Sequence, residues 1–177
     1  MPQITGHLET LYFTSLKTDF GWIRPTSNGQ SLIRLDWNQT GWDELDHPDN
    51  VSRETKSQLE AFFAGNLHQF NLPLAPAGKS AAGKQWLEVM ARIPYGTVMT
   101  YAQFAALAGK PKAARAAGSA CASNPIPIIY PCHRVVRADG SLGNYGGGSD
   151  HHPTHPDNLA RKGDLLRLEA NSAANAA

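Results

Sequence analysis

Three closely spaced prolines, Pro125, Pro127 and Pro131, constrain the fold most strongly, in the stretch NPIPIIYPCHRVV at residues 124–136. A proline ring removes a backbone donor and clashes with the preceding helical turn. It also disfavours helical geometry in the residue before it. We therefore expect no helix between Asn124 and Cys132. The residues IPIIYP should instead be extended and buried, and they should deliver Cys132 to a fixed position.

Cys132 has two interpretations. A buried cysteine is usually inert packing, and we interpret Cys121, in a helix of small residues, in this way. Cys132 differs because His133 and Arg134 follow it directly, which places a base and a positive charge near the thiol. The flanking prolines also make the backbone rigid, as suits a residue that must be positioned. These features favour a reactive cysteine.

His133 needs help to act on Cys132. In a strand, neighbouring side chains point to opposite faces, so proton transfer between the two would require a bridging water. The imidazole would also need an orienting carboxylate from elsewhere in the chain. Glu169 is the strongest candidate, because it lies in the C-terminal helix RKGDLLRLEA, whose leucines anchor that helix to the core.

The first part of the chain has the alternating pattern of strands, followed by the spacing of a helix. Gly65 is placed to end that helix, and a stretch rich in proline and glycine then indicates a linker. The predicted strands are residues 8–16, 20–26 and 31–37 with a turn at 27–29, the helix is 53–65, and the linker is 71–80.

The second part predicts a helix-turn-helix. Residues 82–93 read as a helix that ends at PYG, and residues 100–109 read as the next. Thr100 and Gln103 form a capping-box pattern, and Pro111 suits the first turn of a further helix over residues 111–122. Two short helices with a glycine in the turn between them are typical of this motif, although on its own the pattern is a weak signal.

The helix over residues 111–122 consists almost entirely of alanine and glycine around Arg115. Small residues allow close packing between helices, which is the structural interpretation. They also allow a helix to lie tight against a nucleic-acid backbone, with Arg115 as its one long side chain. The pattern alone leaves both interpretations open.

Composition and charge narrow the class of protein. The chain has 177 residues with 41% hydrophobic and 18% charged, which supports a packed core. Two cysteines make no disulfide framework, and neither an export signal nor a membrane-spanning run is visible. We expect a cytoplasmic protein with reduced thiols. Residues 79–145 carry eight basic and two acidic side chains, which indicates either a polyanionic partner or an ordinary solvated face.

The stretch NPIPIIYPCHRVV, followed by GSLGNYGGG and LLRLE, resembles the O6-alkylguanine-DNA alkyltransferases. The resemblance extends back through AARAAGSACASNP, TYAQFAALAG and IPYGTVMTY, and covers most of residues 82–145 and the C-terminal helix. It implies an α/β, ribonuclease-H-like lobe at residues 1–78 and a mainly α lobe with a helix-turn-helix at 79–170. We expect a frayed tail at 171–177.

The resemblance also implies roles for individual residues. Cys132 would be the alkyl acceptor, and His133, through a water, and Glu169 would complete a proton relay. Asn124 would hold the turn beside the active site. The remaining residues would contact the base or the DNA: Tyr101 near the phosphate and guanine N3, Arg115 as the finger that replaces the extruded base, Arg134, and Asn144, Tyr145, Gly146 and Gly147 in the loop that closes over the base.

The implied activity is DNA repair by a single transfer per molecule. The alkyl group on guanine O6 lies inside the duplex, so the nucleotide must be flipped out, and a narrow, small-residue helix suits entry into the minor groove. The resemblance implies double-stranded DNA carrying O6-alkylguanine, and also O4-alkylthymine, as substrate. We expect a monomer that uses no cofactor and no metal.

Two departures from the family pattern concern the base-binding loop. The connection to the last helix is longer than in the family, because it contains residues 149–160 (GSDHHPTHPDNLA when Gly148 is included). Gly146 stands where many relatives have a small polar residue. The longer connection could widen or gate the pocket. Its histidines, His151, His152 and His155, lack a well-spaced partner set for a metal, and we expect a flexible, solvated loop.

Two other functions compete with repair. An alkyltransferase-like protein would bind the lesion without transfer, but such proteins lack the cysteine, and Cys132 is present. A thiol hydrolase would use Cys132 and His133, but their adjacency and the helix-turn-helix with Arg115 argue against it.

Overall fold

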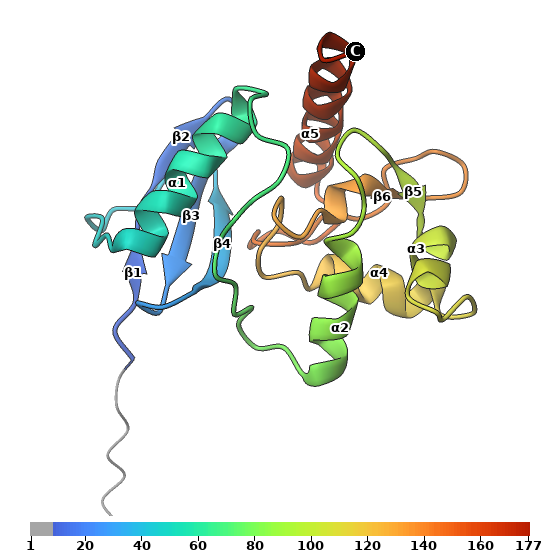
Figure 1. Cartoon of the computed structure of the whole chain (residues 1–177), viewed down its shortest axis with the longest axis horizontal. Coiled ribbons are helices and arrows are strands. Elements are labelled where there is room, and N and C mark those ends of the chain that lie inside the picture. The colour runs from blue at the N-terminus through green and yellow to red at the C-terminus, as the bar shows by residue number, and fades with distance from the viewer. Residues whose placement is uncertain (1–8) are drawn as a thin grey trace, which may run out of the picture.

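Two lobes share one hydrophobic core in the computed structural model, which describes residues 9–177 (Figure 1). Leu8, the first residue of the first predicted strand, lies outside the described residues, as does most of the segment that argues against an export signal. Within the described part of the chain, no helix combines the length and the apolar character that crossing a membrane requires.

A four-stranded antiparallel sheet forms the N-terminal lobe, with β3 at its centre. The first two strands pair with the same edge of β3, and β4 pairs with the other edge. The single strand predicted over residues 8–16 is divided in two, because Ser15 donates both its N–H and its hydroxyl to Asp46. The strands are β1 (Tyr12–Phe13), β2 (Leu16–Thr18), β3 (Gly21–Ser27) and β4 (Leu32–Asn38).

Helix α1 (Asn50–Phe63) covers one face of this sheet (Figure 1). It begins earlier than predicted because Asp49 and Ser52 form a reciprocal capping box, in which each side chain bonds the backbone N–H of the other. Leu59 and Phe62 are fully buried beneath it. Burial of such side chains provides most of the stability of an amphipathic helix.

The C-terminal lobe is mainly helical and contains the predicted helix-turn-helix, formed by α3 and α4. Thr100 and Gln103 make the predicted capping box. Pro111 is not in the first turn of α4: Ala113 N–H donates to the Lys110 carbonyl, so Pro111 occupies the second position of a turn that suits its fixed φ. The elements are α2 (Ala81–Met90), β5 (Met99–Thr100), α3 (Tyr101–Leu107), α4 (Ala114–Ala122), β6 (Val135–Val136) and α5 (Pro156–Asn175).

The segment between Asn124 and Cys132 contains no helix, as predicted, but the prediction that it is extended is wrong. The Tyr130 N–H donates to the Ile126 carbonyl at 3.0 Å and closes a turn. Within it, Ile128 has a φ of 73°, which costs a β-branched residue on the order of 1–3 kcal/mol. Ile128 is 1% exposed, so packing holds the turn in this conformation.

The C-terminal residues do not form the separate frayed tail that was predicted. Helix α5 continues to Asn175. Ser172 donates its hydroxyl to the Gly65 carbonyl at 2.9 Å, so the end of α5 is attached to the turn that follows α1.

The lobes meet along the outer edge of β4, the strand that lies nearest the C-terminal lobe (Figure 1). Leu35 N–H donates to the Pro125 carbonyl at 2.9 Å and Trp37 N–H to the Gly148 carbonyl at 2.6 Å. Gly148 has a φ of +71°, and a Cβ added there would overlap the Leu35 carbonyl oxygen. Only glycine allows this approach of the two backbones.

Replacement of Gly148 by alanine should therefore destabilise the protein more than the same change at Gly140. Both glycines have positive φ, but nothing lies within 4 Å of a Cβ at Gly140. Gly140→Ala should cost about 1–2 kcal/mol from backbone strain alone, and Gly148→Ala should add the cost of moving β4. Urea unfolding of both variants checks this, and equal losses would contradict the proposed close contact between lobes.

Candidate active site

The Cys132 thiol lies at the start of a single 3-10 turn, Cys132–Arg134, which leads directly into β6. It is 1% exposed. Burial raises the pKa of Cys132, although a hydrogen bond from Asn124 and the charge of Lys162 oppose that shift. The thiol is therefore protonated at neutral pH, and it needs a base before it can attack as a thiolate.

Asn124 connects the thiol to the proline-rich turn. Its amide nitrogen donates to the Tyr130 carbonyl at 2.7 Å and approaches the Cys132 Sγ at 3.3 Å. Its amide oxygen accepts from the Ile126 N–H at 3.0 Å. The side chain thus holds the turn at both ends and directs a donor at the sulfur, where it favours the charged form.

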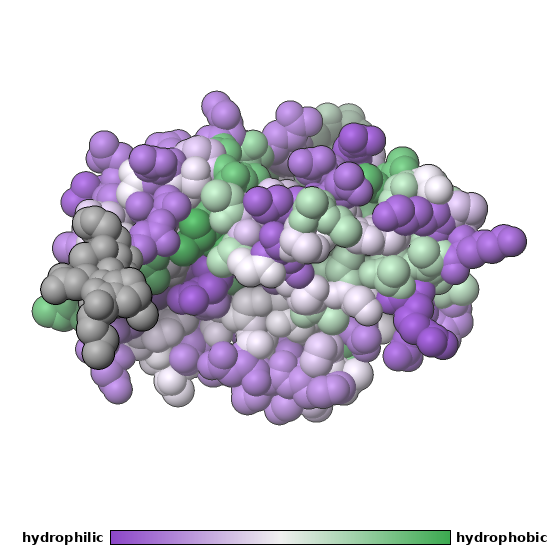
Figure 2. Space-filling view, turned by 90° about the horizontal axis from the view of Figure 1, so that it is seen from below, coloured by the Kyte–Doolittle hydropathy of each residue, from purple (hydrophilic) through white to green (hydrophobic). Residues whose placement is uncertain are grey.

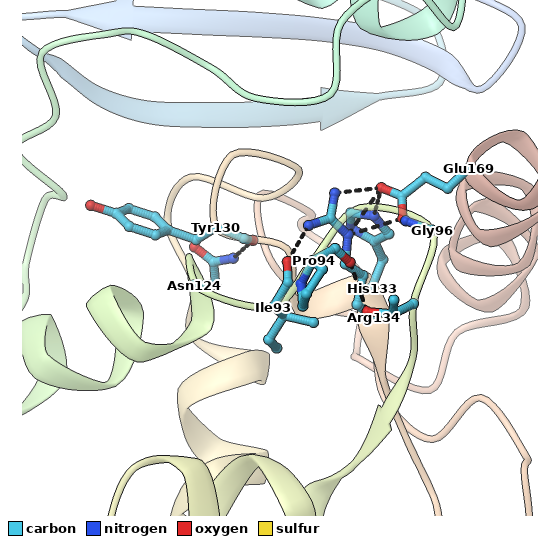
Figure 3. A network of polar contacts seen from close by, with 9 residues as sticks. Ile93, Pro94, Gly96, Asn124, Tyr130, His133, Arg134 and Glu169 are labelled. Atoms are coloured by element: carbon cyan, nitrogen blue, oxygen red, sulfur yellow. Dashed lines mark hydrogen bonds and ion pairs between the residues drawn. The ribbon is translucent and has the colours of Figure 1, made fainter. Parts of the chain in front are cut away.

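His133 and Glu169 form the predicted relay pair. The His133 Nε2 lies 2.7 Å from a Glu169 carboxylate oxygen, and both side chains are fully buried. Figure 3 shows Glu169 reaching from its helix toward His133 and Arg134. Burial would raise the pKa of Glu169, but the hydrogen bonds and charges of His133 and Arg134 outweigh it and lower the pKa to about 2. The carboxylate is therefore ionised at neutral pH.

The ionised carboxylate determines the tautomer of His133. Burial lowers the pKa of His133 below its ordinary value, although Glu169 favours the protonated form. A neutral imidazole that donates Nε2–H to Glu169 has an unprotonated Nδ1. The Nδ1 is buried and has no hydrogen-bond partner among residues 9–177. It is therefore a base available for a proton from the thiol.

Arg134 does not lie in a DNA-facing position, contrary to the prediction that it contacts DNA or the base. Its guanidinium is buried and donates through Nε and Nη2 to the Glu169 carboxylate at 2.8–3.1 Å. Nη1 donates to the Ile93 carbonyl at 2.6 Å (Figure 3). A third donor, the Gly96 N–H, reaches Glu169 at 3.2 Å. Arg134 thus positions the carboxylate.

Lys162 is a site residue that the sequence predictions missed. It is fully buried, and its Nζ donates to the carbonyls of Val135, Leu142 and Asn144. Burial lowers its pKa to about 8. The available signal was the helical spacing of Lys162, Leu165 and Glu169, which places the lysine on the apolar face of α5.

Tyr101 and Arg115 line one shallow groove on the helix-turn-helix, together with Gly118, Arg137 and Asn144. The Tyr101 hydroxyl accepts from the Asn144 N–H at 3.3 Å, while Arg115 is exposed on α4. Seen from below, the C-terminal lobe carries weakly apolar surface between hydrophilic side chains (Figure 2). The structural interpretation of the small-residue helix is confirmed, because α4 packs inward through Ala117 and Cys121. Arg115 is exposed, and its role as a probe of nucleic acid stays a prediction.

The loop of Asn144, Tyr145, Gly146 and Gly147 lies against Asn124, the residue that donates toward the thiol. Gly147 lies so close to the Asn124 carbonyl that an added Cβ would be 2.8 Å from the oxygen. Tyr145 is 2% exposed. Apart from Arg134, whose side chain turns away, the predicted site residues therefore gather around the thiol and the adjoining groove.

The two departures from the family pattern, the longer connection at residues 149–160 and the glycine at position 146, lie against each other in the structure. A Cβ on Gly146 would lie 2.7 Å from Pro153, and the Tyr145 N–H donates to the Pro153 carbonyl at 2.8 Å. Pro153 of the longer connection thus occupies the space that a side chain at position 146 would need. The connection is also attached to α5, because Asn158 donates to the carbonyls of His151 and His152.

Three potential metal ligands lie together in this connection. His151, His155 and Asp157 each place a ligand atom within 4.8 Å of the others. The imidazoles of His151 and His155 are stacked, with centroids 4.1 Å apart and planes at 11°. Because an imidazole binds a metal in its own plane, parallel rings would have to rotate to share an ion. That the chain uses no metal stays a prediction.

Comparison with known proteins places this geometry in a family. Residues 82–171 match the 6-O-methylguanine DNA methyltransferase DNA-binding domain, and residues 11–76 match the ribonuclease-like domain of the same family. A methylated-DNA–protein-cysteine methyltransferase of Methanosarcina barkeri is 37% identical over 92% of this chain and 99% of its own length. The constitutive enzyme of that name from Bacillus subtilis is 35% identical, over 77% of this chain and 87% of its own.

Solved structures agree. The crystal structure of Mycobacterium tuberculosis O6-methylguanine methyltransferase has a TM-score of 0.75 and 32% identity, covering 92% of this chain and 94% of that one. A structure of the M. tuberculosis protein in complex with DNA matches with the same score and identity, over 90% and 93% of the two chains. These matches confirm the predicted two-lobe fold.

The buried Arg134–Glu169 pair predicts a double-mutant effect on stability. Glu169→Gln keeps an acceptor for His133 but leaves Arg134 buried without a counter-charge, so it should cost about 3–5 kcal/mol. Adding Arg134→Met removes the stranded charge and should recover part of that loss. Urea unfolding of the two single variants and the double variant measures the coupling. Additive losses would contradict the account of Arg134 as the counter-charge of Glu169.

Proposed function

The chain belongs to the 6-O-methylguanine DNA methyltransferase family, and we propose that it repairs DNA by moving the alkyl group of O6-alkylguanine to Cys132. The observation that carries this assignment is the arrangement of a buried, protonated thiol beside an unprotonated imidazole nitrogen, on the lobe that bears the helix-turn-helix. DNA is the partner of this lobe.

The reaction follows from these groups. His133 Nδ1 accepts the Cys132 thiol proton through a bridging water, and Glu169 stabilises the resulting imidazolium. The thiolate attacks the alkyl carbon in line, a sulfur–carbon bond forms, and the carbon–O6 bond breaks with its electron pair passing to the guanine. A proton donated to the guanine, with the Tyr101 phenol as a nearby donor, neutralises the leaving group.

The thioether product explains why each molecule would react once. A sulfur–carbon bond of this kind is stable, and no group in the described site is placed to break it. The protein would therefore be consumed in proportion to the lesions that it repairs. No organic cofactor has a role in these steps.

The lesion must leave the duplex to reach Cys132, because the thiol is 1% exposed. Flipping a nucleotide costs a few kcal/mol. In our proposal Arg115, exposed on α4 and in the same groove as Tyr101, fills the vacated space and offsets that cost. The loop glycines then accept the flat base, and Asn144 and Tyr145 border it.

Three finer assignments accompany this function. The same chemistry would accept O4-alkylthymine, whose alkyl carbon is also attached to an exocyclic oxygen. The protein would act as a monomer on one lesion, and in the cytoplasm, where its free cysteines stay reduced. A lesion sensor without transfer is the alternative, but nothing at Cys132 favours it.

Mass spectrometry of the Cys132 peptide tests the assignment. Incubation with a duplex that contains O6-methylguanine should add one methyl group to Cys132 and restore guanine in the DNA, with at most one transfer per molecule. Cys132→Ala should abolish transfer and keep DNA binding, whereas Cys121→Ala, the matched buried cysteine, should keep both. Tight binding with no methyl group on Cys132 would instead support the sensor.

Arg115 should matter only when a base has to be extruded. Arg115→Ala should reduce the rate of repair in duplex DNA about tenfold or more, because the flipped state loses its replacement for the base. Reaction with free O6-benzylguanine base should be nearly unchanged. Lys112→Ala, which removes a charge from the same segment, is the control for general DNA attraction. Equal losses on both substrates would refute the finger assignment.

A further inference from the structure

The outer edge of β4 makes backbone hydrogen bonds to loop segments, where a sheet would otherwise continue with a further strand. Its backbone bonds reach the linker at Pro73, the turn at Pro125 and the loop at Gly148. Covering the edge in this way satisfies donors that would otherwise be open to another chain. Two of the three covered segments belong to the candidate active site.

Those two segments contact each other beside the thiol. Pro125 follows Asn124, whose side chain donates toward the Cys132 Sγ. Gly148 directly follows the loop of Asn144–Gly147, and Gly147 lies against the Asn124 carbonyl. A shift of β4 would therefore move both segments together.

Trp37 is the β4 side chain that reaches furthest into this arrangement. It is 4% exposed, and the Arg161 guanidinium lies 4.4 Å above its ring. Arg161 is held in turn by the Phe20 carbonyl, at 3.0 Å from its Nε. The indole is therefore fixed between the sheet and the start of α5.

Two buried polar atoms, one from each lobe, lack a partner at this contact. The Trp37 backbone N–H donates to the carbonyl of Gly148, three residues after Tyr145, so the indole and the Tyr145 hydroxyl belong to the same contact between the lobes. Both the indole N–H and the hydroxyl are buried, and neither has a hydrogen-bond partner among residues 9–177. The indole N–H favours the ionised form of the phenol, although burial dominates and raises the pKa of Tyr145. Leaving a buried donor and acceptor unpaired is unfavourable, so a small movement that joins them would be favoured.

We propose that Trp37 is a positioning residue for alkyl transfer, and that its indole N–H bonds the Tyr145 hydroxyl when the base-binding loop closes on a substrate. The N-terminal lobe thereby contributes to the reaction without touching DNA. Formation of this bond helps to offset the cost of closing the loop over the base. The inference rests on the proposed function, because it assigns the loop of Asn144–Gly147 to base binding.

The test compares Trp37→Phe with Trp22→Phe. Both changes replace an indole by a phenyl ring in the same sheet, but Trp22 lies on β3, away from the loop. Single-turnover transfer to Cys132 is measured with free O6-benzylguanine and with an O6-methylguanine duplex. Trp37→Phe should slow transfer about tenfold on both substrates, as expected for one lost hydrogen bond. Trp22→Phe should stay within about twofold of the wild type.

DNA affinity and a double-mutant cycle show whether Trp37→Phe removes a positioning contact or disturbs the fold in general. In the Cys132→Ala background, Trp37→Phe should weaken binding of a duplex that carries O6-methylguanine, and should leave the affinity for an unmodified duplex unchanged. Tyr145→Phe removes the other half of the bond, so Trp37→Phe with Tyr145→Phe should be no slower than the slower single variant. If Trp37→Phe does not fold, Tyr145→Phe alone should still slow transfer about tenfold.

The outcomes are distinguishable from failure of the proposed function. If the wild-type protein transfers no alkyl group, the proposed function fails. If the wild type transfers and Trp37→Phe or Tyr145→Phe does so at the same rate, or if their effects multiply, the inference about Trp37 is refuted.

Discussion

The ionised carboxylate of Glu169 is the interaction on which the site depends. It accepts from His133, from Arg134 and from the Gly96 N–H, so it joins α5 to the turn that carries Cys132 and to the loop after α2. A buried carboxylate is costly unless it is paired and hydrogen-bonded, and here its donors come from two segments, the turn of His133 and Arg134 and the loop at Gly96. This one charge therefore determines both the fold of the site and the tautomer of its base.

The remaining geometry follows from two elements, α5 and β4. Helix α5 supplies Glu169 to His133 and Lys162 to the loop carbonyls, while β4 holds the segments at Pro125 and Gly148 through backbone bonds. The thiol itself is protonated and covered. A buried thiol of this kind stays unreactive until the alkylated nucleobase enters the site. This protection suits a protein that, in the proposed reaction, can react only once.

Local patterns predicted much of the fold and the chemistry. The prolines excluded a helix before Cys132, and the capping box located α3. The leucine-anchored C-terminal helix pointed to Glu169 as the partner of His133, and the resemblance to a repair family is confirmed. The errors had local causes. Ile128 takes a positive φ that only burial explains, and α5 continues through residues whose composition resembles a tail.

The contacts between distant segments could not be read in the sequence. Lys162 and Trp37 look like ordinary surface and strand residues, because the groups that they contact, backbone carbonyls for Lys162 and the Gly148 carbonyl and Arg161 for Trp37, lie far along the chain. The role of Pro153 beside Gly146 likewise requires the folded loop. Arg134 was assigned to DNA because its sequence neighbours suggested it, whereas burial directs it to Glu169.

The central claim is that burial keeps His133 neutral, and that Glu169 holds its one proton on Nε2 and so leaves Nδ1 unprotonated. Nitrogen-15 NMR of the labelled imidazole at neutral pH tests this directly. The account predicts a protonated Nε2 and an unprotonated Nδ1 in the unreacted protein. An imidazolium, or the tautomer with its proton on Nδ1, would contradict it, because the thiol would then have no base to receive its proton.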